Sequence, residues 1–252
     1  MVGSRLENKV AFVTGAGQGV GRGIAMALAA EGAKIAVTGR TKSKCDSVVS
    51  ELAERGAFGI SIACDVESRA AIDAAVAETI AEFGRIDIVV NSAQSVYYPS
   101  LRKLTEEVFK SMLQSGPIGC LNVMQATFDQ LRTHRGCVIN LGSGSSLMPH
   151  PAMGGYAAAK EAIRVLSRTA AVEWGRFGIR VNSICPLAAS PGWDSFGGET
   201  GSDAAVIAQV PLGRMGDCEL DIGRAAVYLA SEDAAYVTGT TLMVDGGFNY
   251  LR

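Results

Sequence analysis

The chain has 252 residues, of which 48% are hydrophobic and 19% charged, and its formal net charge is −2 at pH 7. This composition is typical of a globular protein and excludes a disordered one. The near-neutral charge, without a long basic run, argues against nucleic acid or an anionic membrane as a partner. No run approaches the roughly 18 apolar residues of a membrane span, and the N-terminus carries no signal-peptide stretch, so we expect a cytoplasmic protein.

Cysteine and histidine usage argues against a disulfide-stabilised protein and against a metalloprotein. None of the six cysteines forms a C-x-x-C pair, which in so long a chain predicts reduced, mostly buried thiols. The two histidines, His134 and His150, have no metal-ligand spacing to a cysteine or an aspartate. We therefore predict that the protein has no metal site.

Short apolar runs alternate with longer segments of helical periodicity along the chain. The runs are rich in Val and Ile and apolar on both faces, as strands of a buried parallel sheet are. The predicted strands are Val10–Thr14, Ile35–Thr38, Phe58–Ala63, Ile86–Asn91, Cys137–Leu141, Arg180–Ile184 and Thr241–Val244. The predicted helices are Val20–Glu31, Thr41–Arg55, Glu67–Phe83, Thr105–Arg132, Gly155–Trp174 and Glu219–Leu229. This alternation predicts an α/β fold: a single Rossmann-like domain over residues 1–252, with a doubly wound seven-stranded parallel sheet and helices on both faces.

A glycine-rich turn, TGAGQGVG at residues 14–21, joins the first strand to the first helix. Glycines permit a tight turn and let backbone N–H groups approach a pyrophosphate, which the helix N-terminus also favours. The alternative is a plain strand–helix turn. The position after the first strand of an α/β alternation favours a dinucleotide site.

The end of the second strand bears on the choice of dinucleotide. Gly39 stands where an NAD-binding protein would carry an acid for the ribose 2′-hydroxyl, and Arg40 follows it, with Lys42 and Lys44 close behind. A guanidinium matches a phosphate in a bidentate way. We predict NADP(H) as the cofactor in preference to NAD(H). The alternative is that these cations only solvate the start of a helix.

The motif Tyr156-x-x-x-Lys160 places a phenol and an ammonium on one face of a helix. A free tyrosine has a pKa near 10. A nearby ammonium, and the positive nicotinamide of an oxidised complex, would favour the phenolate and bring that pKa towards neutrality. Tyr156 could then act as a general acid or base.

Together, the turn Gly15-x-x-x-Gly19-x-Gly21 and the Tyr156/Lys160 motif resemble the short-chain dehydrogenase/reductase family, in its compact single-domain branch, from Lys9 to Gly247. The resemblance implies an oxidoreductase that works as a homo-oligomer, a tetramer or dimer. It implies that Ser143, after the fifth strand, orients the substrate oxygen, with Ser145 and Ser146 as alternatives. The predicted catalytic residues are therefore Ser143, Tyr156 and Lys160.

The resemblance also implies the coenzyme contacts. Asp65 would bind the adenine amino group. Asn91, in a partial match (NSAQ) to the family's Asn-Asn-Ala-Gly, would line the site, or would only tie adjacent strands together. Many NADP-dependent relatives have a second basic residue where this chain has Gln18. The predicted coenzyme-binding residues are Gly15, Gly17, Gln18, Gly19, Val20, Gly21, Arg40, Asp65, Val66, Asn91, Ala93, Tyr156, Lys160, Pro186 and Ala188.

Two departures from the family pattern matter for catalysis. Gly116 replaces a catalytic asparagine and is followed by Pro117. One hypothesis is that the proline disturbs the helix, exposes a carbonyl and preserves a water relay to Lys160. The alternatives are that the relay, or catalysis itself, is lost. After the sixth strand, Pro186 matches the family but Leu187 replaces a glycine, and Ser190 stands in for a threonine.

The predicted pocket walls are residues 94–98, 145–153 and 188–209, with a substrate loop at about 187–210. They contain no Arg or Lys, which favours a neutral, moderately apolar ketone or secondary alcohol as the small-molecule substrate. His150 could contact the substrate or be a solvated loop residue. A second hypothesis for the function is that the protein is a non-catalytic NADP(H)-binding regulator or scaffold. An epimerase or dehydratase is less favoured, because such relatives usually have a longer C-terminal region.

Overall fold

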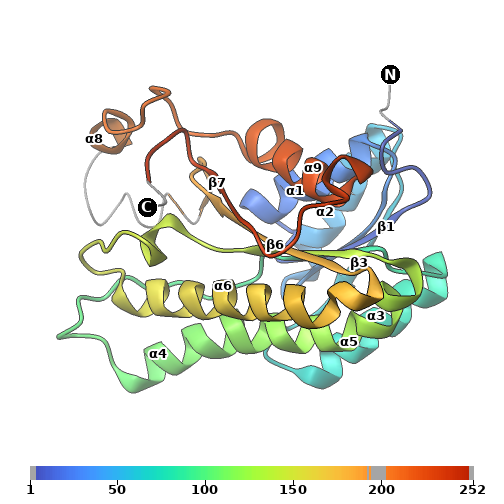
Figure 1. Cartoon of the computed structure of the whole chain (residues 1–252), viewed down its shortest axis with the longest axis horizontal. Coiled ribbons are helices and arrows are strands. Elements are labelled where there is room, and N and C mark those ends of the chain that lie inside the picture. The colour runs from blue at the N-terminus through green and yellow to red at the C-terminus, as the bar shows by residue number, and fades with distance from the viewer. Residues whose placement is uncertain (1–3, 192, 194–202, 250–252) are drawn as a thin grey trace.

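The computed structural model describes residues 4–191, 193 and 203–249, and it is built around one parallel sheet (Figure 1). The strand order is β3-β2-β1-β4-β5-β6-β7. The strands are β1 (Val10–Thr14), β2 (Lys34–Gly39), β3 (Gly59–Ala63), β4 (Ile88–Asn91), β5 (Cys137–Leu141), β6 (Arg180–Pro186) and β7 (Thr241–Val244). The chain order reverses between β1 and β4, and ligands of open α/β sheets bind at such a switch point. The predicted fold class is confirmed.

Helices cover both faces of the sheet. The helices are α1 (Gly19–Ala30), α2 (Lys42–Glu54), α3 (Arg69–Phe83), α4 (Glu106–Leu113), α5 (Gly119–His134), α6 (Gly154–Trp174), α8 (Asp203–Ile207) and α9 (Arg224–Ala230). One face carries α1, α2 and α9, and the other carries α3 to α6 (Figure 1). Because strand side chains alternate, Ala11 and Val13 pack into the first layer and Phe12 into the second. None of the described helices has the length and apolarity needed to cross a membrane.

Two predicted helices are corrected by the structure. The segment predicted as one helix over Thr105–Arg132 contains a π-helical turn at Gln114–Ile118, between α4 and α5. Pro117 lies inside this turn, where it has no N–H for a regular helical bond. The segment Glu219–Leu229 likewise begins with a π-helical turn, Cys218–Gly223, and only its second half is α9.

The described part of the predicted substrate loop, at about 187–210, contains the short helix α8. Part of the predicted substrate loop, at 192 and 194–202, lies outside the described residues. The strands agree with the predicted ones to within two residues at each end. All five residues of β1 and all five of β5 are buried. Burial on both faces gives these strands the continuous runs from which they were predicted.

Candidate active site

A cleft of about 380 Å³ opens where the strands end. Its wall includes the residue after β2 (Arg40), the loop after β4 and the end of β6, so it lies over the switch point. The volume falls within the usual range for small-molecule sites. The predicted residues that line the cleft are Gly15, Gly17, Gln18, Gly19, Val20, Gly21, Arg40, Asp65, Val66, Ala93, Tyr156, Lys160 and Pro186. Three others, Asn91, Ser143 and Ala188, are not in its lining.

The glycines of the turn form a floor without side chains. Gly15 and Gly19 have φ angles of 64° and 56°, which favour glycine. A Cβ on Gly15 would lie 2.8 Å from the Ala93 nitrogen, and one on Gly21 only 2.4 Å from the Gly15 oxygen. The backbone of the turn therefore packs directly on the loop after β4, with the N-terminus of α1 behind it. This is the shape and polarity that a pyrophosphate requires.

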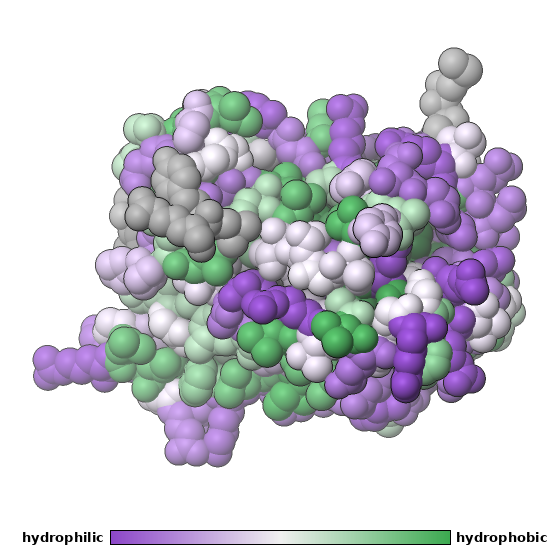
Figure 2. Space-filling model, viewed as in Figure 1, coloured by the Kyte–Doolittle hydropathy of each residue, from purple (hydrophilic) through white to green (hydrophobic). Residues whose placement is uncertain are grey.

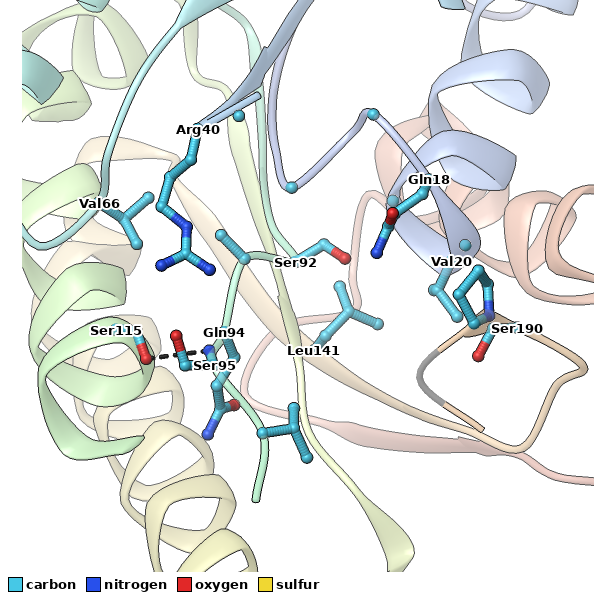
Figure 3. A pocket seen from close by; sticks show the side chains of 18 of the residues that line it. Gln18, Val20, Arg40, Val66, Ser92, Gln94, Ser95, Ser115, Leu141 and Ser190 are labelled. Atoms are coloured by element: carbon cyan, nitrogen blue, oxygen red, sulfur yellow. Dashed lines mark hydrogen bonds between the residues drawn. The ribbon is translucent and has the colours of Figure 1, made fainter. Parts of the chain in front are cut away.

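The cations near β2 separate into two groups. Arg40 is exposed and reaches into the cleft beside Val66 (Figure 3). Lys44 also lines the cleft, and its Nζ donates to Gln18 Oε1. Lys42 instead donates to Asp46 and Ser61, at 2.7 and 2.8 Å. Of these three cations, Arg40 and Lys44 therefore line the cleft, and Lys44 brings its charge to Gln18, where the sequence has no basic residue.

Lys160 is buried, with 6% of its surface exposed. Its Nζ donates to the Leu141 carbonyl, at the end of β5, at 2.7 Å and lies 5.7 Å from the centre of the Tyr156 ring. Burial lowers the pKa of Lys160 to about 8. The helix α6 thus holds the phenol and the ammonium side by side, as their spacing predicts.

The Tyr156 phenol on α6 lies near Ser143, in the loop after β5. Burial raises the pKa of Tyr156, and the neighbouring Tyr98 adds to this rise, whereas the nearby Ser143 hydroxyl opposes it. The pKa therefore moves in the opposite direction from the one we expected from Lys160. The protein alone keeps this phenol protonated.

The serine loop is held by its own hydroxyls. Ser143 Oγ lies 2.8 Å from Ser145 Oγ and accepts from the Ser145 N–H at 3.3 Å. Ser146 Oγ donates to the Ser143 carbonyl at 2.9 Å, which fits a loop hydroxyl. His150 stacks on Phe248, with ring centres 6.1 Å apart, so this histidine packs against the C-terminal segment.

Asn91 ties two adjacent strands together, which is the second of the two roles that we considered for it. It lies opposite Asn140 in the β4–β5 register, and its Nδ2 donates to Asn140 Oδ1 at 2.9 Å. Its own Oδ1 is buried without a hydrogen-bond partner in the described part of the chain. Ala188 is likewise engaged by backbone, in a bridge to Gly216.

The loop after β4 also lines the cleft. Gln94 and Ser95 belong to the predicted wall segment 94–98, whereas Ser92 and Ser115 are cleft residues that we did not single out from the sequence. The Ser95 N–H donates to Ser115 Oγ at 3.0 Å (Figure 3). The sequence does carry a signal for Gln94, because it replaces the last glycine of the family's Asn-Asn-Ala-Gly motif.

A switch-point cleft with a glycine floor and a tyrosine beside a buried lysine defines the class of Rossmann-fold oxidoreductases. The family model described as "Enoyl-(Acyl carrier protein) reductase" matches residues 15–249. A 12alpha-hydroxysteroid dehydrogenase of a Clostridium species is 41% identical, with 96% of each chain covered. A 3-oxoacyl-(acyl-carrier-protein) reductase of Staphylococcus aureus is 34% identical, with 95% of this chain and 97% of the relative covered. A peroxisomal 2,4-dienoyl-CoA reductase of Danio rerio is 32% identical, with 96% and 82% covered. The chain belongs to the short-chain dehydrogenase/reductase family of oxidoreductases.

Proposed function

We propose that this protein is an NADP(H)-dependent oxidoreductase that interconverts neutral ketones and secondary alcohols. The observation that carries the proposal is that Tyr156 and Lys160 lie side by side in the cleft with the glycine floor, with Ser143 near the phenol. The residues Ser143, Tyr156 and Lys160 are the proposed catalytic group. The other predicted cleft residues are the proposed coenzyme contacts.

The chemistry requires one hydride and one proton per carbonyl reduced. A reduced nicotinamide held in this cleft would supply the hydride. Tyr156 donates the proton to the carbonyl oxygen, and its phenol, whose pKa is raised, is in the protonated form that this step needs. The Ser143 hydroxyl donates a hydrogen bond to the same oxygen and stabilises the charge that develops there. In the reverse direction Tyr156 accepts the proton of the alcohol.

The charge pattern supports NADP(H) over NAD(H). A 2′-phosphate would meet the Arg40 guanidinium and the Lys44 ammonium from two elements. The position of the acid in NAD-binding proteins is occupied by Gly39, where even a Cβ would lie 3.3 Å from Cys45 Sγ. A larger side chain there would press on α2.

Coenzyme titrations of three variants test this assignment. We expect Arg40→Asp to weaken NADPH binding about 100-fold and NADH binding little, and Lys44→Gln to weaken NADPH about tenfold, because each removes a charge-assisted contact. Lys42→Gln is the matched control and should change neither, because Lys42 is bound to Asp46. Equal losses for both coenzymes with Arg40→Asp would refute the NADP(H) assignment.

The predicted substrate walls favour a neutral substrate, because segments 94–98 and 145–153 carry no Arg or Lys. The first segment contributes Gln94, Ser95 and Val96 to the cleft, whereas the second lines a separate pocket. The names of the relatives suggest a test panel of hydroxysteroids, 3-oxoacyl thioesters and simple ketones. NADPH consumption with at least one carbonyl compound, abolished in Tyr156→Phe, is the expected result. NADPH binding without turnover on any of them would favour the regulator or scaffold instead.

By the same resemblance we propose a cytoplasmic homo-oligomer, a tetramer or dimer. Hydrophobic residues gather on the surface over α6 (Figure 2), including Val165 and Val172, which are 50% and 84% exposed. The two valines lie seven residues apart, on one face of the helix. This face would be covered by a second copy, which light scattering of the protein and of a Val172→Glu variant tests.

A further inference from the structure

The two departures from the family pattern at positions 94 and 116 meet in space. Gln94 lies in the loop after β4, and Gly116 lies in the π-helical turn between α4 and α5. A Cβ on Gly116 would be 3.0 Å from Gln94 Nε2 and 3.1 Å from Gln94 Cδ. The carboxamide of Gln94 therefore covers Gly116 and fills the space that a side chain at 116 would need.

This carboxamide is buried and has nothing to bond to. Both Gln94 Nε2 and Oε1 are closed to solvent, and neither has a partner among the residues that the structure describes. Buried amide groups in folded proteins almost always bond to protein or to an ordered water. Gln94 lies on the cleft wall near Ser95 and Ser115 (Figure 3), so a water at this place would face the cleft.

A second polar space adjoins it. A small cavity, large enough for about one water, is lined by Asn91, Ser115, Gly116 and Lys160. Ser115 and Lys160 line both this cavity and the cleft. Asn91, which lines this cavity, also has an unpartnered carboxamide oxygen, Oδ1, among the described residues. A charged Lys160 has three N–H donors, of which one bonds to the Leu141 carbonyl.

We propose that Gln94 is a positioning residue for Lys160, acting through buried water. Its carboxamide takes over the place left open by Gly116 and holds a water path that runs from the cleft past the π-helical turn to the Lys160 ammonium. Along this path one proton per turnover returns from solvent to Lys160 and on to Tyr156, which loses a proton when a carbonyl is reduced. The inference rests on the proposed function and adds Gln94 to it.

An exchange of the two side chains tests the proposal. Gln94→Leu keeps the size of the side chain but not its hydrogen bonds, and Gln94→Gly empties the space; both should lower kcat at least about tenfold and leave KM and the NADPH Kd within about twofold. Gly116→Asn alone should also be slow, because its side chain meets Gln94. The double variant Gln94→Gly/Gly116→Asn should recover kcat to within about threefold of the original protein.

Several outcomes would overturn the proposal without touching the proposed function. Full activity of Gln94→Leu would show that only packing matters, and a double variant as slow as the single ones would show that the two positions are not exchangeable. A high-resolution crystal structure gives a readout independent of activity: it should show ordered water bonded to Gln94 and to Lys160, and dry surroundings of Gln94 would refute the path. Absence of coenzyme-dependent turnover in the original protein, by contrast, would refute the proposed function itself.

Discussion

The buried ammonium of Lys160 predicts how stability depends on pH. Its pKa falls from 10.5 in the unfolded chain to about 8 in the folded protein because of burial. The folded state thus binds the proton less tightly, so the charged lysine opposes folding below pH 8, and this opposition fades as the pH rises from 8 to 10.5. At ~1.36 kcal/mol per pH unit, it amounts to about 3 kcal/mol at pH 7 and roughly 1.5 kcal/mol at pH 9.5.

Lys160→Met removes the charge and nearly keeps the volume. It also removes the hydrogen bond to Leu141, so the pH dependence of the difference between the proteins is more informative than its size. The free energy of unfolding of the variant minus that of the original protein should fall by about 2 kcal/mol between pH 7 and pH 9.5. Urea denaturation at both pH values measures it, with Lys110→Met, an exposed lysine on α4, as the control. An equal difference at the two pH values would contradict the reasoning.

The same titration has a kinetic consequence. If the ammonium of Lys160 assists Tyr156, kcat/KM for ketone reduction should decrease as the pH rises through about 8, because the free enzyme then loses that charge. A rate that is flat between pH 7 and pH 9 would separate Lys160 from the proton transfer.

Three further substitutions test the site and the fold. Tyr156→Phe should lower kcat at least about 100-fold while NADPH still binds in fluorescence titrations, because only the proton donor is lost; near-normal turnover would exclude it as the acid. Gly21→Ala places a Cβ 2.4 Å from the Gly15 oxygen and should weaken NADPH binding about tenfold or more, whereas unchanged affinity would place the coenzyme elsewhere. Asp87→Ala removes a buried carboxylate that accepts from the Val10 N–H at 3.0 Å and should cost about 3 kcal/mol in urea denaturation; a loss below about 1 kcal/mol would show that the bond contributes little.

The sheet and the helix α6 could be predicted because their signals are local. A strand such as β1 is buried on both faces, so its whole sequence is apolar. Tyr156 and Lys160 need only helical spacing to share a face. The π-helical turn at Gln114–Ile118 could not be predicted in the same way, because Pro117 predicts a disturbance without saying which hydrogen bonds replace the lost one.

The positions where the site differs from its family pattern could be understood only from contacts between residues far apart in the sequence. Read singly, Gln18 lacks a basic group and Gly116 lacks a carboxamide, and each suggests a weakened site. In the folded chain Lys44, 26 residues from Gln18, brings an ammonium to the first position, and Gln94, 22 residues before Gly116, brings a carboxamide to the second. A missing side chain therefore indicates a lost function only when no neighbour in space supplies the same chemical group, and at both positions a neighbour does.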